Sequence, residues 1–190
     1  MPSASARKID SPEAIWQADR RHVLHPWTQF GSFERDGSLV FERGEGCWLW
    51  DTSGKRYFDA VGGMWCTNVG LGRAEMAEAI AAQAQKLAFS NTFVDASNVP
   101  SAQLAAKLAE LAPGDLNRVH FTTCGSTAVD TAWRMVQFYQ RAKGKPDKTQ
   151  VIARDMSYHG STYIGQSLGQ RPGDRAPEFL YSETGRAWPR

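Results

Sequence analysis

The spacing of apolar residues in the first third of the chain predicts a helix followed by strands. Ser11-Pro12-Glu13 has a cap residue, a proline and an acid in the order of a helix start, and Pro26 ends that helix near residues 22–25. From Leu39 to Ala60 the pattern is typical of strands, with a hairpin turn over residues 51–55. This part therefore predicts a helix and small antiparallel strands.

Beyond a glycine-rich loop region at residues 62–72, the apolar spacing becomes helical. A helix is expected from Arg73, because its apolar positions share one face. A second helix follows, and Pro113-Gly114 ends it. The chain then carries two short apolar runs, residues 119–122 and 151–153, which are typical of buried strands.

A third helix is expected between those two strands. It opens at Thr127, where Thr127 and Asp130 have the spacing of a capping box. The alternation of helices and strands predicts an α/β domain. We divide the chain into residues 1–69, an N-terminal arm with small strands, and residues 70–190, the first part of a larger domain. The tail from Gly169 offers no clear partner for its apolar residues.

Composition and charge exclude several classes of protein. The 190 residues are 42% hydrophobic and 22% charged, which is typical of a folded globular chain rather than a disordered one. The net charge of +2 gives no reason to expect nucleic acid or an anionic membrane as a partner. No apolar run approaches the roughly 18 residues that a membrane span needs, and no secretory signal opens the chain. A cytoplasmic location is expected by default.

The three cysteines are odd in number and widely separated, at Cys47, Cys66 and Cys124. They match neither a disulfide framework nor a zinc site, so reduced and mostly buried thiols are expected. His22 and His25 add no recognisable zinc spacing, and we expect no metal site.

Residues 121–130 are the most informative segment for function. A predicted strand ends in a turn of small residues and passes directly into a helix. Such a junction directs backbone N–H groups and the positive end of the helix dipole at one point, which suits a phosphate. Gly125 allows close approach, while Ser126 and Thr127 offer hydroxyls. The alternative is an ordinary strand-to-helix turn with a threonine cap.

A second candidate loop, residues 156–162, follows the second predicted strand. Loops at the carboxyl ends of parallel strands are where α/β sheets bind ligands. Tyr158, next to His159 and Gly160, could stack on a planar ring. The alternative is a surface loop whose histidine has no special role.

Together these two segments resemble class III aminotransferases, whose phosphate turn reads S-G-S-E-A and whose ring-stacking loop reads Y-H-G. The segment His25-Pro26-Trp27-Thr28-Gln29, and the glycine and aromatic pattern from Gly46 to Asp59, add to the resemblance. The aromatic residues there, and Trp65, are most similar to those of ω-transaminases. The resemblance implies a fold-type-I α/β architecture, pyridoxal 5'-phosphate as cofactor, and a homodimer.

The resemblance also implies roles for particular residues. Gly125, Ser126 and Thr127 would hold the cofactor phosphate, Tyr158 would stack on the pyridine ring, and His159 would support that loop. Trp27, Phe30 and Trp65 are similar to aromatics that sort amine and keto-acid substrates. For Trp27 and Phe30, plain core packing is an equally good interpretation.

Two departures from the family pattern lie in the phosphate turn, where Cys124 replaces a usual serine and Thr127 an acid or asparagine. In addition, the family's Schiff-base lysine lies beyond the matched segments, and none of the seven lysines here has a strand-end context. We therefore expect no catalytic residue in this chain. The implied reaction of the full protein moves an amino group from an amine or amino acid to a keto acid such as pyruvate.

Several alternatives stay open. The chain could be a truncated, non-catalytic fragment or a module that only binds a phosphorylated ligand. Gly70-Leu71-Gly72 before a helix invites a dinucleotide-binding interpretation, but Glu75 replaces the third glycine of that motif. A relative that decarboxylates its substrate or shifts an amino group within one molecule also fits the motifs.

Overall fold

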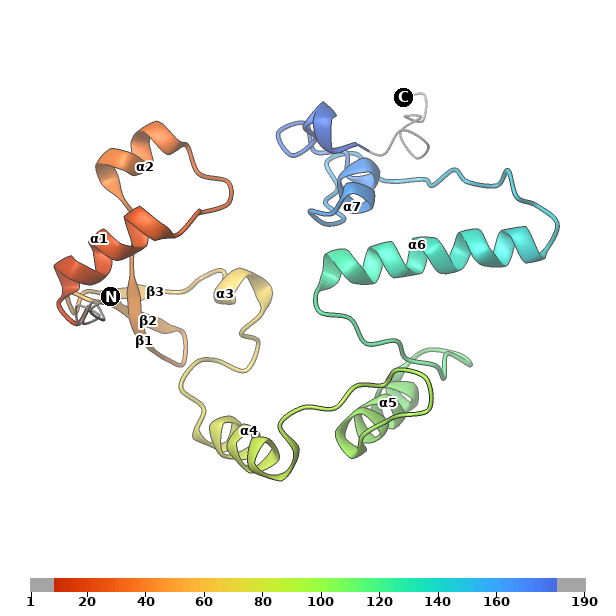
Figure 1. Cartoon of the computed structure of the whole chain (residues 1–190), viewed down its shortest axis with the longest axis horizontal. Coiled ribbons are helices and arrows are strands. Elements are labelled where there is room, and N and C mark those ends of the chain that lie inside the picture. Colours follow the sequence, from red (N-terminus) through yellow and green to blue (C-terminus); the bar gives the residue numbers. More distant parts are fainter. Residues whose placement is uncertain (1–8, 181–190) are drawn as a thin grey trace, which may run out of the picture. The chain divides into compact units, whose positions relative to one another are not determined.

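The computed structural model of the chain describes residues 9–180, which form two compact units (Figure 1). The first unit runs to Thr92 and the second starts at Phe93. The domain division at residue 69/70 expected from the sequence stays a prediction. No helix in the described part of the chain is long and apolar enough to cross a membrane.

The first unit opens with two helices. Helix α1 (Pro12–His22) begins as predicted, with the Ser11 side chain accepting a hydrogen bond from the Ala14 N–H at 3.2 Å. Helix α2 (Phe30–Asp36) was not predicted, because seven residues are too few for an apolar period to show. Gly37 ends α2 with a φ of 65°, a conformation that glycine adopts without strain.

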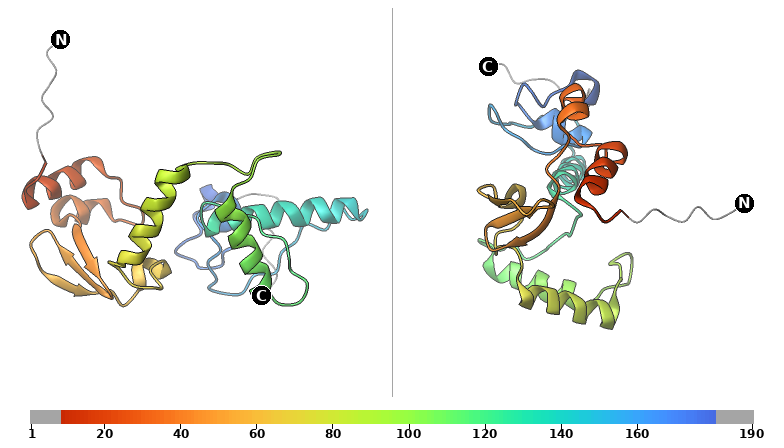
Figure 2. Two further views of the ribbon diagram at one scale, coloured as in Figure 1. Left: turned by 90° about the horizontal axis from the view of Figure 1, so that it is seen from below. Right: turned by 90° about the vertical axis from the view of Figure 1, so that its left-hand side faces the viewer.

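The three strands of this unit form the antiparallel sheet that the pattern predicts. They are β1 (Phe41–Glu45), β2 (Trp48–Asp51) and β3 (Arg56–Phe58), in the order β1-β2-β3. Figure 2 shows them side by side in orange. Trp48 pairs with Phe58 across β2 and β3, and their rings meet edge to face with centroids 5.2 Å apart. Such cross-strand pairs fix the register of a small sheet.

Asp51 organises the turn between β2 and β3. Its Oδ1 accepts hydrogen bonds from the N–H groups of Ser53 and Lys55, at 2.9 and 3.0 Å, and from the Ser53 hydroxyl at 2.7 Å. Its Oδ2 accepts from the Tyr57 hydroxyl at 2.9 Å. Asp51 is only 8% exposed, so these donors replace the water that its carboxylate loses. Gly54 completes the turn.

Two helices complete the first unit. Helix α3 (Gly62–Trp65) is a short, irregular turn within the predicted loop region, with Gly63 and Met64 in left-handed conformations. Helix α4 (Ala74–Leu87) matches the predicted helix, and Arg73 is its N-cap.

The described part of the second unit, residues 93–180, contains three helices and a short 3₁₀ turn. They are α5 (Val99–Leu111), α6 (Gly125–Ala142), α7 (Tyr163–Leu168) and the 3₁₀ turn Pro177–Phe179. Figure 1 shows α7 beside the N-terminal end of α6, and residues of these two helices are in contact.

The prediction of strands at residues 119–122 and 151–153 is wrong for the structure as it stands. Neither run forms a strand, and the three-stranded sheet described above is the only sheet that residues 9–180 contain. The physical reason is that a strand exists by pairing, and no neighbouring strand within the described residues offers its N–H and C=O groups to these runs.

The described chain has a very small core. Trp133 on α6 and Leu168 on α7 are its buried large apolar side chains. The expectation of mostly buried thiols is wrong, since Cys47, Cys66 and Cys124 are all exposed. The tail from Gly169 does find one partner, because the Phe179 ring meets the Tyr163 ring edge to face at 6.4 Å. Residues 181–190 of that tail lie outside the described residues.

The aromatic side chains of the first unit are not buried. Trp27, Phe30, Trp48 and Trp65 are exposed, while Trp16 and Trp50 are half-buried. The aromatic residues of the first unit therefore find few partners within that unit. A surface of this kind is typical of an interface that another segment or subunit covers.

Candidate functional site

The start of α6 is the predicted phosphate turn, with one change of register. Cys124 is the N-cap and Gly125 the first helical residue, so the predicted start at Thr127 is two residues late. The capping box joins Cys124 to Thr127: the Thr127 N–H donates to the cysteine sulfur, and the Thr127 Oγ1 accepts from the Cys124 N–H at 3.2 Å. The predicted box between Thr127 and Asp130 is therefore wrong. A small polar residue at position 124 does the capping that the sequence assigned to threonine.

The space in front of this turn suits a phosphate. A Cβ built on Gly125 would meet no heavy atom within 4 Å, so the helix start is open at that residue. Helix α6 has 18 residues, long enough for the full partial positive charge at its N-terminus. The hydroxyl of Ser126, the second helical residue, lies at the same end. The residues present therefore fit the phosphate group of pyridoxal phosphate.

The surroundings of the Cys124 thiol also favour negative charge at the start of α6. Hydrogen bonds from Thr127, the backbone N–H first and the hydroxyl second, lower the pKa of this thiol, with smaller contributions from Ser126. A thiolate is favoured where N–H and O–H donors converge, and a phosphate oxygen would use the same donors.

The loop that carries Tyr158 lies against this turn, although it is more than thirty residues away in sequence. The Ser161 N–H donates to the Ser126 hydroxyl at 3.0 Å, and the two serine hydroxyls lie 3.5 Å apart. Gly160 is buried against Ser126. The structure thus brings together the two segments that the sequence assigned to one cofactor site.

Tyr158 and His159 lie two and one residues before Gly160. Tyr158 is 48% exposed, so its side chain is partly open to solvent. The Arg171 guanidinium lies 5.8 Å from the centroid of that ring, at a distance where a cation is weakly attracted to an aromatic face. His159 is half-buried. Their roles toward the cofactor stay predictions.

The three predicted substrate-binding aromatics lie in the first unit. Trp27 and Phe30 are 70% and 63% exposed, so neither belongs to a core within the described residues. Trp65 is also exposed, and both tryptophans have a positive φ, 60° for Trp27 and 66° for Trp65. Bulky residues adopt this conformation rarely, and such positions are found preferentially at ligand sites. Their place in a substrate pocket stays a prediction.

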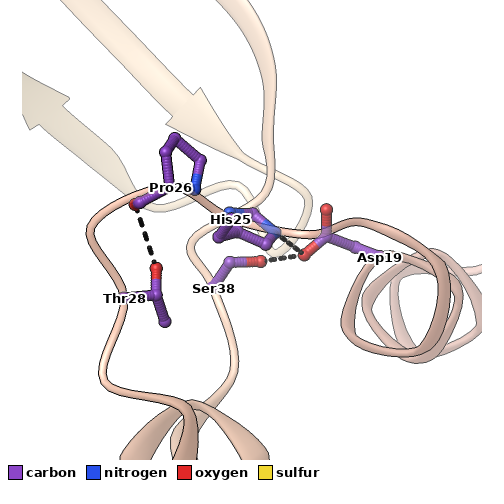
Figure 3. Close-up of polar contacts among 5 residues, drawn as sticks. All are labelled: Asp19, His25, Pro26, Thr28 and Ser38. Atoms are coloured by element: carbon purple, nitrogen blue, oxygen red, sulfur yellow. Dashed lines mark hydrogen bonds and ion pairs between the residues drawn. The ribbon is translucent and has the colours of Figure 1, made fainter. Parts of the chain in front are cut away.

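The segment before Trp27 is anchored by its histidine. The His25 Nε2 lies 3.0 Å from the Asp19 Oδ2 of α1, and the Ser38 hydroxyl donates to the same oxygen (Figure 3). The His25 ring also lies 4.7 Å from the Phe33 ring of α2. These contacts tie α1, α2 and the connecting segment together. They give His25 a structural role in this unit.

One contact near the candidate site was not foreseen from the sequence. The Thr162 hydroxyl donates to the Asp130 Oδ1 at 2.7 Å. The Y-H-G motif ends before Thr162, and the spacing of Asp130 from Thr127 predicts a helix cap instead. In the sequence, the only signal for this contact is a threonine two residues after the glycine of Y-H-G.

Comparison with known proteins gives a consistent result. Residues 32–177 match the family model described as aminotransferase class-III. The putrescine–pyruvate aminotransferase of Pseudomonas aeruginosa is 43% identical over 155 residues, which cover 81% of this chain and 34% of that protein. The mitochondrial gamma-aminobutyrate transaminase 1 of rice is 38% identical over 173 residues, covering 87% of this chain and 34% of that protein.

Solved structures agree with these matches. An (S)-enantioselective ω-transaminase of Thermomicrobium roseum superposes with a TM-score of 0.82 and 38% identity, over 89% of this chain and 37% of the other. The ω-transaminase of Pseudomonas jessenii in complex with PMP has a TM-score of 0.83 and 37% identity, over 87% of this chain and 38% of the other. The chain thus spans about a third of the length of the relatives it matches.

Proposed function

Because the chain belongs to the class III aminotransferases, a family that depends on pyridoxal phosphate, we propose that it supplies the phosphate-binding and ring-stacking elements of a transaminase. The substrates of the whole protein are an amine or amino acid as donor and a keto acid such as pyruvate as acceptor. The match to a relative named for putrescine and pyruvate supports this substrate class. The fold is that of the fold-type-I transaminases that the chain superposes on.

The observation that carries the proposal is the hydrogen bond between Ser161 and Ser126. It holds the Tyr158 loop against a helix start that is open at Gly125. Gly125 and Ser126 bind the phosphate through N–H groups, with the hydroxyls of Ser126 and Thr127 as further donors. Tyr158 orients the ring by stacking, and His159 supports the loop that carries it. The cofactor, when bound, supplies an electron sink for the reacting carbon.

The aromatic residues of the first unit are proposed to line the substrate pocket of the whole enzyme. Trp27, Phe30 and Trp65 present large apolar faces to their surroundings. Such faces select substrates by shape and exclude water from the reacting groups. We also propose a homodimer, because the exposed aromatics of this unit need a covering surface.

Residues 1–190 alone are proposed to have no transaminase activity. The six lysines within the described residues lie in helices, at a helix end or in turns and loops: Lys55, Lys86, Lys107, Lys143, Lys145 and Lys148. None of these six lysines lies at the carboxyl end of a strand. Borohydride reduction with pyridoxal phosphate, followed by mass spectrometry, is the test. Specific labelling of one lysine would contradict the proposal.

The phosphate site itself is tested by Ser126→Ala in the full-length protein. Loss of a hydrogen bond to a charged group weakens binding about tenfold to a hundredfold. In absorbance titrations we expect that loss for pyridoxal phosphate. Pyridoxal, which lacks the phosphate but still uses the Tyr158 loop that Ser126 holds, should show a smaller loss. Ser101→Ala on α5 is the matched control, since it keeps the backbone N–H that the Asn98 side chain caps. Equal losses for both ligands would show that Ser126 does not contact the phosphate.

A further inference from the structure

Asp130 links the phosphate-turn helix to the loop that follows Tyr158. It lies in the second turn of α6, and its Oδ1 accepts a hydrogen bond from the Thr162 hydroxyl at 2.7 Å. Both side chains are half-buried, and the two residues are 32 positions apart in sequence. A carboxylate with a hydroxyl donor at this distance forms a strong, charge-assisted hydrogen bond.

This bond is one of two that run in parallel. Ser126 and Asp130 are four residues apart on α6, so they lie on the same face of the helix. Their partners, Ser161 and Thr162, are consecutive in the loop. Two adjacent loop residues are therefore held by two adjacent positions of one helix face, which fixes both the distance and the direction of the loop.

Thr162 also connects this arrangement to α7. Thr162 is the N-cap of α7, and its hydroxyl oxygen accepts a hydrogen bond from the Gly165 N–H at 3.2 Å. The same hydroxyl thus donates to Asp130 and accepts from α7. Consequently the Asp130 bond can be removed without removing the cap, whereas loss of the Thr162 hydroxyl removes both.

We propose that Asp130 and Thr162 are positioning residues for the cofactor site: their hydrogen bond sets where the Tyr158 ring lies relative to the phosphate turn. Neither residue needs to touch the cofactor. The proposal rests on the proposed function, because it assumes that phosphate and ring bind at these two segments. It goes beyond that function in assigning the alignment of the two segments to a side-chain pair outside the motifs themselves.

The test compares two ligands in the full-length protein carrying Asp130→Ala. Inorganic phosphate uses only the helix start, so its affinity should stay within about twofold of wild type. Pyridoxal phosphate also uses the Tyr158 ring, so we expect about tenfold weaker binding, the effect of one lost hydrogen bond to a charged group. The visible circular dichroism of the bound cofactor, which reports how its ring is held, should fall as well.

Conservative variants separate positioning from general stability. Asp130→Asn keeps an acceptor oxygen and Thr162→Ser keeps the hydroxyl, so both should bind pyridoxal phosphate within about threefold of wild type. Thr162→Val should weaken it at least as much as Asp130→Ala does. In the double variant Asp130→Ala/Thr162→Val, the loss should equal that of Thr162→Val alone, since the pair shares one bond. Glu110→Gln, which breaks an exposed ion pair with Lys107 on α5, is the control.

The outcomes distinguish a failure of the proposed function from a failure of the positioning role of Asp130 and Thr162. If Ser126→Ala leaves phosphate binding unchanged, the proposed function fails. If Ser126→Ala weakens phosphate binding but Asp130→Ala and Thr162→Val bind pyridoxal phosphate like wild type, the positioning role alone is overturned. Equal losses for phosphate and pyridoxal phosphate in Asp130→Ala would also overturn it, because they would indicate a general disturbance of α6. Should Asp130→Ala fail to fold, the contrast between Thr162→Ser and Thr162→Val decides.

Discussion

Gly160 lies so close to Ser126 that no side chain fits between them. A Cβ on residue 160 would lie 2.8 Å from the Ser126 Oγ and 2.9 Å from its Cα. Gly160 also has a φ of 130°, which side chains disfavour. Behind it, a Cβ on Gly165 would lie 2.8 Å from the Gly160 Cα. The loop at Gly160 thus lies between the backbone of α6 at Ser126 and the backbone of α7 at Gly165. Only glycine allows such a close approach.

We predict that Gly160→Ala separates the loop from α6. The added methyl group meets backbone, which cannot move aside as a flexible side chain would, and the backbone angle is strained as well. We expect a loss of at least about 1 kcal/mol of stability and much weaker binding of pyridoxal phosphate. Thermal unfolding and absorbance titration are the measurements. Gly173→Ala is the control, because a Cβ there would meet no atom within 4 Å; if the two variants behave alike, the close approach has no energetic consequence.

The capping box at the start of α6 gives a second prediction. Thr127→Val removes the oxygen that accepts the Cys124 N–H, so one backbone donor of the helix start loses its partner. Losses of this kind cost about 1 kcal/mol. Thr127→Ser keeps the oxygen and should be close to wild type in thermal unfolding. A Thr127→Ser variant as unstable as Thr127→Val would show that the methyl group, and not the cap, is what matters.

The sequence was sufficient for elements whose signals are local. Ser11 and Pro12 mark the start of α1, and the Asp51 turn marks the β2–β3 hairpin, because caps and turns depend on residues within one turn of each other. Helices α4 and α5 have apolar spacing over thirteen or more residues, enough for the period to be recognised. Helices α2 and α7, with seven and six residues, give no such period.

What depends on contacts between distant residues could not be predicted in the same way. The motifs identified the α6 start and the Tyr158 loop, and the family comparison placed them together. Cysteine is an uncommon N-cap, so the preferences of helix starts favour Thr127 over Cys124, the residue that caps α6. Asp130 fitted the capping pattern equally well by spacing, yet its partner is Thr162, and no local rule relates positions 32 residues apart.

Cys124 should be the most reactive of the three thiols. All three cysteines are exposed, and hydrogen bonds, from Thr127 first, lower the pKa of the Cys124 thiol. The thiolate is the nucleophile, so alkylation rises as pH rises through the thiol pKa. For Cys124 that rise should come below the ordinary value of about 8.5. Iodoacetamide labelling with peptide mass spectrometry between pH 6 and 9 measures it.

The same labelling experiment checks the phosphate site independently. A phosphate at the helix start competes for the donors that stabilise the thiolate and adds negative charge beside it, so the pKa of the Cys124 thiol should rise. Pyridoxal phosphate or inorganic phosphate should therefore slow labelling of Cys124 and leave Cys47 and Cys66 unchanged. Equal slowing at all three cysteines would point to a general effect of the ligand instead.

Asp51 should make the first unit sensitive to acid. Hydrogen bonds from the Ser53 hydroxyl, and then from Tyr57 and two backbone N–H groups, lower the pKa of this carboxyl in the folded state. A group with a lowered folded pKa contributes stability that is present above its unfolded value, about 3.9, and lost as pH falls through the folded pKa. The difference in unfolding free energy between wild type and Asp51→Asn should therefore shrink below about pH 4.

A second variant tests whether the Ser53 hydrogen bond is the cause of the lowered pKa of Asp51. Ser53→Ala removes the largest contribution to the lowered pKa, so the folded pKa should move back toward its ordinary value. The stability that Asp51 loses in acid should therefore be smaller than in wild type, and the loss should be complete at a higher pH. Denaturant unfolding between pH 2 and pH 6 measures both variants. An acid-unfolding profile of Asp51→Asn that parallels wild type across this range would rule out the carboxylate as the source.

The apolar face of α4 should be covered in the full-length protein. Met76, Ile80 and Leu87 follow helical spacing and are all exposed within the described chain, Ile80 to 66%. An exposed position tolerates substitution within about 0.5 kcal/mol, whereas truncation of a buried isoleucine costs about 2–5 kcal/mol. We therefore expect Ile80→Ala to change the stability of residues 1–190 alone by less than about 0.5 kcal/mol and that of the full-length protein by about 2 kcal/mol or more. Glu78→Ala, an exposed polar position on the same helix, should have a small effect in both. Denaturant unfolding of residues 1–190 and of the full-length protein measures the change in unfolding free energy for each of the two substitutions. A small effect of Ile80→Ala in the full-length protein would mean that this face of α4 stays in contact with water.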